Sequence, residues 1–494
     1  MGPSLLCETV TGRTMAELTA ARDVAAGDLV ELRLDGVSDL DVAGALAGRR
    51  TPAVVTCRPA WEGGRFEGSE AERRAVLARA LELGAEYVDV EWRAAFGDLI
   101  RNHHTRVVVS AHDFTGVPPD LPGQVRAMRA TGAAVIKVAV TASRLADTLP
   151  LIDIARGGAA VVVGMGDAGV PSRLLASRFG SRWTYAGNGV APGQVPARRM
   201  LEQFRFRAIT PDTRIYGVVG HNVMHSVSPA MHNAAFAAAG LDAVYVPLGA
   251  ADFADFLTFA DVLDVAGASV TMPFKLDALR ASTGADELTR RVGAANTLRR
   301  RGGEWEAVNT DVAGLLEPLD AMVRANLGGR LGDLRVSVIG AGGAARAAVV
   351  ALASRGARVT VHARREAQAR EVAGSLCGDL RVSGDQGIRV GPWPPAPGSW
   401  DVLVNGTPLG SAAARDESPL PGGPFDGRLV YDLTYGPVES PLLREARRAG
   451  CLTLGGLPML VAQAERQFEW WTGTRPIAGV MNEAARRTYA HHDV

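Results

Sequence analysis

Short apolar runs alternate along the first two hundred residues with segments rich in alanine, leucine and arginine. The runs have the composition of strands in a parallel sheet, and the segments between them, such as 69–83 and 141–156, have the spacing of amphipathic helices. Eight strand–helix units predict a (β/α)₈ TIM barrel. The predicted strands are residues 5–10, 29–34, 53–58, 87–91, 107–111, 134–140, 159–163 and 183–186.

Lys137 lies inside the predicted strand AAVIKVAV (133–140), among small and β-branched apolar residues. A lysine is rarely buried unless another group pairs with it or a reaction uses it. A desolvated amine is more often neutral, so it can attack a ketone and form a Schiff base. Alternatively, the lysine stem packs inside while its ammonium group reaches water at the strand end. This strand alone leaves both interpretations open.

Ionisable side chains also stand at the ends of the neighbouring predicted strands. In a TIM barrel the catalytic groups gather at the carboxyl ends of the strands. Histidine moves protons near neutral pH, and arginine is suited to a substrate carboxylate. Five consecutive strands with such groups therefore favour a catalytic site. The residues at these ends are Glu31, Arg33, Arg58, Glu91, His112 and Lys137.

Motifs along this half resemble those of the type I 3-dehydroquinate dehydratases. They are VELRLD (30–35), TCRPAWEGG (56–64), YVDVEW (87–92), SAHDF (110–114), VIKVA (135–139), PSRLLASRFGS (171–181) and APGQ (191–194). The resemblance implies that Lys137 forms an imine with the substrate ketone, and that His112 shuttles protons while Glu91 orients it. It also implies that Val190 stands where the family usually has a serine. The implied substrate-binding residues are Arg173 and Gln194, with Glu31, Arg33 and Arg58 lining the pocket.

A domain boundary is predicted at the turn formers Pro211 and Asp212, between a first domain (1–207) and a second (214–325). In the second domain, Ser228 is placed to cap a helix that starts at Pro229. Ser226 and Ser228 then lie where free backbone N–H groups suit a carboxylate. Alternatively, Ser228 only caps the helix, which would leave Ser226 without a role.

Lys275 and Asp311 form the second candidate catalytic pair. We expect Pro273 to open a helix with Lys275 in its first turn, where the helix dipole disfavours a cation. Asp311 alone would more often be a helix cap, but with Lys275 it makes a proton-handling pair. The motifs SxS, PxK, NT and NTD resemble the substrate domain of shikimate dehydrogenases. The resemblance implies a carboxylate site at Ser226 and Ser228, hydroxyl contacts from Thr271, Asn296 and Asp311, and catalysis by Lys275 with Asp311.

A nucleotide-binding domain is predicted at 330–455. A strand at 334–339 leads into GAGGAAR and a helix, the G-x-G-x-x-A setting that brings backbone amides to a pyrophosphate. Arg364 and Arg365 stand where NAD-binding sites usually carry an acid, so they favour the 2′-phosphate of NADP; a solvated basic turn is the alternative. The candidate cofactor residues are Gly340, Ala341, Gly342, Gly343, Ala344, Arg364 and Arg365, joined through the resemblance by Asn405, Thr407 and Met459.

The closing segment, 456–494, is predicted to form helices that pack back on the 214–325 domain and leave a cleft between two lobes. Gln463 shares a helix face with Met459 and is either buried and satisfied or in contact with a ligand. The resemblance favours a substrate contact for Gln463, and it implies a substrate-side role for Tyr435.

Composition narrows the class of protein. Lysine plus arginine equals aspartate plus glutamate at 53 each, which gives no sign of a nucleic-acid or membrane-surface partner. The four cysteines have neither metal-ligand nor CxxC spacing, so we expect reduced thiols and no metal site. Without a signal-like or membrane-spanning apolar run, a cytoplasmic monomer or homodimer that binds small molecules is expected.

The two resemblances name consecutive reactions. The first half is expected to dehydrate 3-dehydroquinate to 3-dehydroshikimate, and the second to reduce that ketone to shikimate with NADPH. One alternative is a dehydrogenase acting on quinate with NAD, against which Arg364 and Arg365 argue. Another is that one half is a non-catalytic binding module, which would predict broken catalytic sets.

Overall fold

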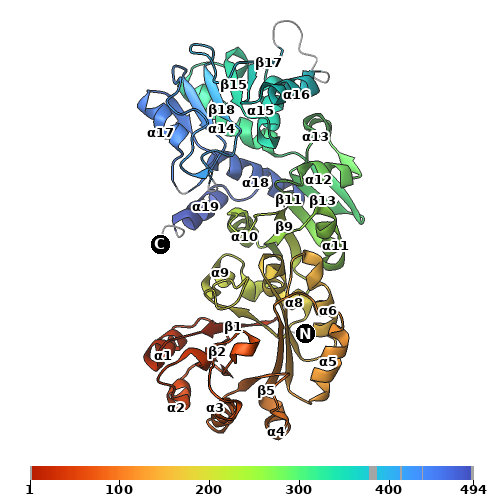
Figure 1. Cartoon of the computed structure of the whole chain (residues 1–494). Helices are drawn as coiled ribbons and strands as arrows, with labels where there is room; N and C mark the ends of the chain where they lie inside the picture. The colour runs from red at the N-terminus through yellow and green to blue at the C-terminus, as the bar shows by residue number, and fades with distance from the viewer. Residues whose placement is uncertain (1–2, 378–386, 412–413, 437, 491–494) are drawn as a thin grey trace. The chain divides into compact units, whose positions relative to one another are not determined.

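The computed structural model describes residues 3–377, 387–411, 414–436 and 438–490. Figure 1 follows the chain from the N-terminal barrel strands to the C-terminal helices. Backbone contacts divide it into two compact units, one of Met1–Pro229 with Asp242–Val265 and one of Ala230–Leu241 with Ala266–Val494. This division differs from the predicted domain boundaries, because the segment just after the barrel belongs to the same unit as the barrel.

Eight parallel strands form the first sheet, in the order β7-β6-β5-β4-β3-β2-β1-β8. The Arg182 amide, just before β8, donates to the Ala160 carbonyl in β7, so the two edges meet and the barrel is nearly closed. The predicted (β/α)₈ barrel is confirmed, with strand limits within about two residues of those expected. The strands are β1 (Leu5–Val10), β2 (Leu29–Arg33), β3 (Ala53–Thr56), β4 (Tyr87–Glu91), β5 (Val107–Asp113), β6 (Val135–Thr141), β7 (Ala160–Met165) and β8 (Trp183–Ala186).

The barrel helices form where the polar and apolar spacing predicts them. In α3, Ser69 and Glu72 form a capping box that satisfies free N–H groups at the start of the helix. The helix expected at 141–156 is wrong in its first half, because β6 runs to Thr141 and a 3₁₀ turn follows. The shorter helix begins at Pro150, since proline suits the first helical position, where its missing N–H would have no partner within the helix. The helices are α1 (Met15–Asp23), α2 (Val42–Leu46), α3 (Glu70–Glu82), α4 (Gly97–Asn102), α5 (Leu121–Ala130), α6 (Pro150–Arg156), α7 (Val170–Leu174), α8 (Ala176–Phe179) and α9 (Ala197–Glu202).

Two strands and a helix complete the first unit. β9 (Arg214–Gly220) and β10 (Ala243–Gly249) pair in parallel, and α11 (Phe253–Leu263) follows them. α11 contacts the 3₁₀ turn η4 (Leu145–Thr148) that comes after β6. β10 contacts α7 and the turn η5 (Asp167–Gly169) that comes after β7. The loops at the catalytic end of the barrel are therefore partly covered by a later segment.

The second unit contains antiparallel strands with helices beside them. β11 pairs antiparallel with β13, which pairs antiparallel with β14, and β12 runs parallel to β14. α18 packs along α14, where a Cβ on Gly314 would lie 2.7 Å from the Cβ of Gln463, so only glycine permits this approach. The elements are α10 (Ser228–Ala238), β11 (Val265–Val270), α12 (Lys275–Ala281), β12 (Gly284–Ala285), α13 (Glu287–Val292), β13 (Thr297–Arg301), β14 (Glu304–Val308), α14 (Asp311–Asn326), α18 (Leu457–Thr472) and α19 (Val480–Ala490).

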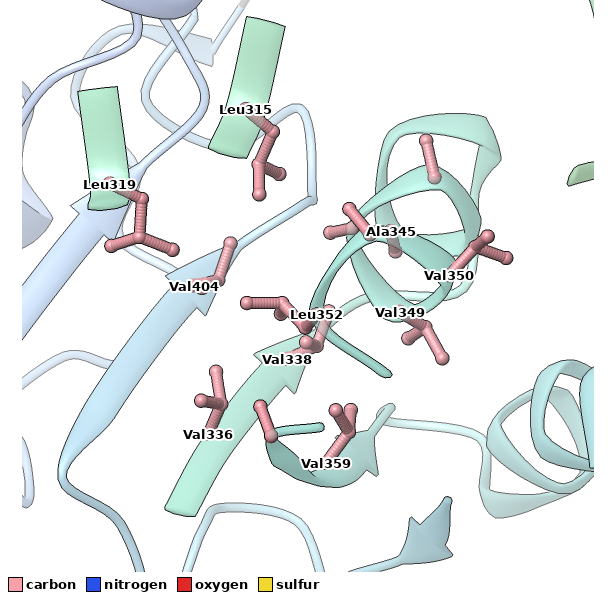
Figure 2. Packing of buried hydrophobic residues seen from close by; sticks show 14 of the residues in the cluster. Leu315, Leu319, Val336, Val338, Ala345, Val349, Val350, Leu352, Val359 and Val404 are labelled. Carbon is pink, nitrogen blue, oxygen red and sulfur yellow. The ribbon is translucent and has the colours of Figure 1, made fainter. Parts of the chain in front are cut away.

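A six-stranded parallel sheet completes the second unit, in the order β17-β16-β15-β18-β19-β20. This is the Rossmann order, in which the strand sequence reverses next to the first strand. Figure 2 shows Val336 and Val338 of β15 and Val404 of β18 beneath side chains of α14 and α15. The elements are β15 (Arg335–Ile339), α15 (Gly343–Ser354), β16 (Arg358–His362), α16 (Glu366–Cys377), β17 (Arg389–Val390), β18 (Val402–Asn405), β19 (Leu429–Asp432), α17 (Pro441–Arg448) and β20 (Leu452–Leu454).

The structure confirms the α/β class, with a TIM barrel first and a Rossmann sheet after it. Within the described residues, no helix combines the length and apolar character that crossing a membrane would require.

Candidate active sites

Lys137 lies in the interior of the barrel, on β6, with only 5% of its surface exposed. Its Nζ is 3.2 Å from Oδ2 of Asp89 and 3.6 Å from Oε1 of Glu31. The same amine lies 4.1 Å from the ring centroid of Tyr185. The geometry therefore excludes the interpretation in which the ammonium group reaches bulk water at a strand end.

Asp89 is a site residue that the sequence reasoning missed. Besides Lys137, it accepts hydrogen bonds from Arg58 Nη2 at 2.9 Å and from the Ser110 hydroxyl at 2.6 Å. Burial alone would raise the pKa of this carboxyl, but the charges of Arg58 and Lys137 hold it well below its usual value. An acid in the middle of a buried strand is as unusual as a lysine there, so the aspartate of YVDVEW could have been recognised from the sequence as a candidate site residue.

His112 is paired with Glu62 and not, as predicted, with Glu91. Oε1 of Glu62 lies 3.3 Å from Nδ1 of His112 and accepts the His112 backbone N–H at 2.9 Å. Burial, with the charges of Arg58 and Lys137, lowers the pKa of His112 well below 6.5. The imidazole is therefore neutral near pH 7 and can accept a proton, while Glu62 fixes its orientation.

The prediction for Glu91 fails because two arginines occupy its carboxylate. Arg58 Nη1 lies 2.7 Å from Oε1 of Glu91, and Arg73 of α3 pairs with the other oxygen. Both Glu91 and Arg73 are fully buried. Glu91 therefore holds Arg58 in place instead of touching His112.

Arg173, on α7, is the candidate group for the substrate carboxylate. It is 1% exposed and donates to the carbonyls of Tyr185 at 3.3 Å and Pro192 at 3.2 Å, while its Nε has no partner among the described residues. Burial lowers the pKa of Arg173 to about 10, and within the described chain no carboxylate pairs with it. A buried cation without an acid partner suits an anionic ligand.

One cavity of about 200 Å³ joins the predicted residues, except Glu91, with Glu62. Gln194 uses its side-chain oxygen to accept the backbone N–H groups of Val190 and Ala191, at 2.9 and 3.1 Å, so in this structure it shapes its own loop. Val190 lines the same cavity with an apolar side chain. The predicted residues that line the cavity are Glu31, Arg33, Arg58, His112, Lys137, Arg173 and Gln194.

The two acids can be separated by experiment. We expect Glu62→Gln to lower the dehydratase kcat about 10–100-fold with little change in melting temperature, because it loosens the orientation of His112. Glu91→Gln should instead lower the melting temperature, since it disturbs a buried ion pair.

The pH dependence of the wild-type dehydratase gives a second test of the same assignment. His112 must be neutral to act as a base, and its pKa is lowered. The acid limb of kcat/KM against pH should therefore lie below pH 6.5. An acid limb above pH 7, or equal effects of both variants on kcat, would contradict this assignment.

In the second unit, Lys275 and Asp311 form a direct pair, with Nζ 2.5 Å from Oδ2. α12 begins at Lys275 and not at Pro273 as expected, which still leaves the lysine in the first turn. The Asn296 amide donates to Oδ1 of Asp311 at 2.8 Å and to Oε1 of Gln463 at 3.3 Å. The structure therefore brings together the four residues Lys275, Asn296, Asp311 and Gln463.

The other predicted substrate residues are Ser226, Ser228, Thr271 and Tyr435. The Ser226 hydroxyl accepts the backbone N–H of Ser228 at 3.2 Å, and α10 begins at Ser228, so Ser228 is the first helical residue and not the cap that was predicted. Thr271 is half-buried in the loop before α12. Tyr435 follows β19 and is 42% exposed. Contacts from these residues to a substrate stay predictions.

At the predicted nucleotide site, the glycine loop before α15 has open space around it. Gly340 has a φ of 109°, which favours glycine, and no atom of the described residues lies within 4 Å of a Cβ placed on Gly342 or Gly343. The backbone amides at the start of α15 are thus accessible to a pyrophosphate. Arg364 and Arg365 are exposed just after β16. These residues fit a dinucleotide with a 2′-phosphate.

Asn405, at the end of β18, holds the loop that follows this strand through hydrogen bonds. It is fully buried, donates to Asp432 at 2.9 Å and accepts the N–H of Thr407 at 2.9 Å. Asp432, which the sequence reasoning missed, also accepts from Ser440 at 2.5 Å. Thr407 is half-buried on this loop, whereas Met459 is buried in α18. The geometry therefore makes Asn405 a loop-shaping residue.

Comparisons with known proteins match both halves of the chain. Family models match at residues 6–211 for type I 3-dehydroquinase, 218–298 for the shikimate dehydrogenase substrate binding domain and 456–486 for the shikimate 5′-dehydrogenase C-terminal domain. The bifunctional 3-dehydroquinate dehydratase/shikimate dehydrogenase of Arabidopsis thaliana, described as chloroplastic, is 35% identical over 95% of this chain and 82% of its own.

Relatives of the second half alone are also similar. The shikimate dehydrogenase (NADP(+)) of Methanocella arvoryzae is 40% identical over 55% of this chain and 98% of its own length. A crystal structure of a shikimate dehydrogenase in complex with NADP+ is 31% identical, with a TM-score of 0.52, over 57% of this chain and 97% of its own. The chain therefore belongs to the bifunctional 3-dehydroquinate dehydratase/shikimate dehydrogenases, the shikimate-pathway enzymes that join these two activities in one polypeptide.

Proposed function

We propose that Lys137 forms the imine with 3-dehydroquinate and that His112 moves the protons of the dehydration. The observation that carries this proposal is a buried amine that shares one cavity with a neutral, oriented histidine and with an arginine that has no acid partner among the described residues. Arg173 then binds the substrate carboxylate. The ketone carbon is thereby presented to Lys137 and the adjacent carbon to His112.

Lys137, His112 and water are enough to complete the dehydration. The Lys137 amine adds to the ketone carbon, and one water leaves as the C=N bond forms. His112 takes a proton from the carbon beside the iminium, whose positive charge accepts the electron pair. The substrate hydroxyl then leaves as water with the proton that His112 returns, and a further water hydrolyses the imine to free Lys137.

Reduction of the imine by borohydride tests this mechanism directly. The wild-type chain treated with 3-dehydroquinate and borohydride should gain the mass of a reduced adduct, on the peptide that contains Lys137. Borohydride without substrate is the control and should leave the mass unchanged. An adduct on another lysine, or none while the dehydratase is active, would overturn the proposal.

For the second half, we propose that Lys275 and Asp311 handle the proton of the reduction. The pair is closed at 2.5 Å, and Asn296 fixes the orientation of Asp311. Lys275 donates a proton to the ketone oxygen as it becomes a hydroxyl, and Asp311 holds the amine in position and stabilises its charge. When bound, NADPH supplies the hydride. The open α15 terminus holds the pyrophosphate, and Arg364 and Arg365 hold the 2′-phosphate.

Removal of both arginines should change the cofactor preference. We expect the double variant Arg364→Ala/Arg365→Ala to raise the KM for NADPH about 10–100-fold, because two charge-assisted contacts to the phosphate are lost. The KM for NADH, which lacks this phosphate, should change less than twofold, and the dehydratase serves as the internal control. Equal effects on both cofactors would contradict the assignment.

A further inference from the structure

The segment β10–α11 belongs to the substrate-domain match of the dehydrogenase, yet it packs on the catalytic end of the barrel. α11 contacts η4, which follows the Lys137 strand β6, and β10 contacts α7, which carries Arg173. Both contacts lie within the first compact unit. A part of one enzyme thus supports loops of the other.

Asp255, in the first turn of α11, makes the central contact. Its side chain is fully buried, and its Oδ2 accepts the backbone N–H of Leu145 at 3.0 Å while Oδ1 accepts that of Ala146 at 2.9 Å. Oδ2 also accepts the N–H of Ala251 at 3.0 Å. One carboxylate therefore caps the first turn of η4 and holds the start of α11 to it.

Arg144 adds an ion pair at the edge of the same contact. Its Nη2 lies 2.8 Å from Asp252, and its Nε lies 3.8 Å from Asp255. Asp252 is 52% exposed, so this outer pair contributes less than the buried carboxylate of Asp255. The contact therefore has a buried centre and a solvated rim.

The capped loop is connected to the substrate-binding loop. The Ala142 amide, at the end of β6, donates to the Met165 carbonyl at 3.0 Å, and Met165 lines the dehydratase cavity. Gly166 then packs so closely on Gly193 that a Cβ on Gly193 would lie 2.5 Å from the Gly166 carbonyl oxygen. Gly193 follows Pro192, whose carbonyl accepts from Arg173. A continuous series of contacts thus runs from Asp255 to the proposed carboxylate site.

We propose that Asp255 is a positioning residue of the dehydratase, and that the functional dehydratase extends through α11 to Leu263. Asp255 fixes the loop after β6, this loop fixes the turn after β7, and that turn sets the position of the Pro192–Gln194 loop beside Arg173. This inference rests on the proposed role of Arg173 in binding the substrate carboxylate. The dehydratase is then an activity that the dehydrogenase segment helps to build.

Asp255→Asn in the full-length chain tests this inference, because the shape is kept while an N–H donor replaces one acceptor. We expect the KM for 3-dehydroquinate to rise about 10-fold, with a smaller effect on kcat, because one buried acceptor is lost and substrate positioning is loosened. The reduction of 3-dehydroshikimate by the same chain should stay within about twofold. Asp252→Asn is the matched control, since asparagine also caps helices, and it should leave both activities unchanged.

A merely structural role would lower the melting temperature and both activities in proportion, and this outcome would overturn the proposal. An unchanged KM in folded Asp255→Asn would overturn it too. If Asp255→Asn does not fold, Arg144→Ala probes the same loop from the barrel side and should raise the dehydratase KM alone, by about two- to threefold. Borohydride trapping of the imine in the wild type separates the role of Asp255 from the imine mechanism. If the wild type is trapped but Asp255→Asn has an unchanged KM, only the role of Asp255 is rejected. If the wild type is not trapped, the proposed mechanism is rejected.

Discussion

Lys137→Ala abolishes the dehydration of 3-dehydroquinate and leaves the reduction of 3-dehydroshikimate intact. We expect the dehydratase kcat to fall by about 10⁴-fold or more, because the variant has no amine to form the imine. The fold should survive, since Arg58 and Ser110 still donate to Asp89 when Lys137 is gone. NADPH consumption, followed separately from each substrate, measures the two activities.

Lys137→Arg is the matched control for charge. It keeps a cation near Asp89 and Glu31 but cannot form an imine, so it should be as inactive as the alanine variant. Activity in the arginine variant would show that the charge and not the amine is needed. If the wild type itself consumes NADPH only from 3-dehydroshikimate, the barrel is inactive on 3-dehydroquinate, and Val190→Ser is then the first substitution to make.

Lys275→Met and Asp311→Asn produce the opposite defect. We expect the dehydrogenase kcat to fall about 10²–10⁴-fold in each, because proton transfer to the ketone oxygen is lost or misdirected. The dehydratase, in the other compact unit, should keep its full rate. Asp311→Asn retains an oxygen that can accept the Asn296 amide, so its melting temperature should change little.

A mixture of Lys137→Ala and Lys275→Met chains serves as a control for both results. Each chain lacks one activity, so the mixture should consume NADPH from 3-dehydroquinate after a lag in which the intermediate accumulates. Failure of the mixture would mean that at least one variant has also lost its remaining activity, so that its defect extends beyond the residue replaced. A full dehydrogenase rate in Lys275→Met would remove Lys275 from the mechanism.

Local patterns were enough to determine the architecture from sequence. Eight apolar runs with amphipathic segments between them predicted the barrel, because a parallel strand buried on both faces has a recognisable composition. The glycine motif between a strand and a helix likewise predicted the start of α15. Lys137 and Lys275 were singled out because a lysine is unusual at each of these positions, whereas His112 was one of several ionisable residues at strand ends and Asp311 was singled out through its pairing with Lys275.

Only the tertiary structure decided which groups meet. Glu91 stands at a strand end like the other candidates, but Arg73 reaches it from α3 while Glu62 reaches His112 from the loop after β3. Strand composition cannot show such pairings, because they depend on how distant segments pack. The same holds for Asp255, which lies 110 residues from Leu145 along the chain yet caps its turn. Sequence determined the elements and the chemical groups, and packing determined the partners of each group, since hydrogen bonds act only over the short distances that folding creates.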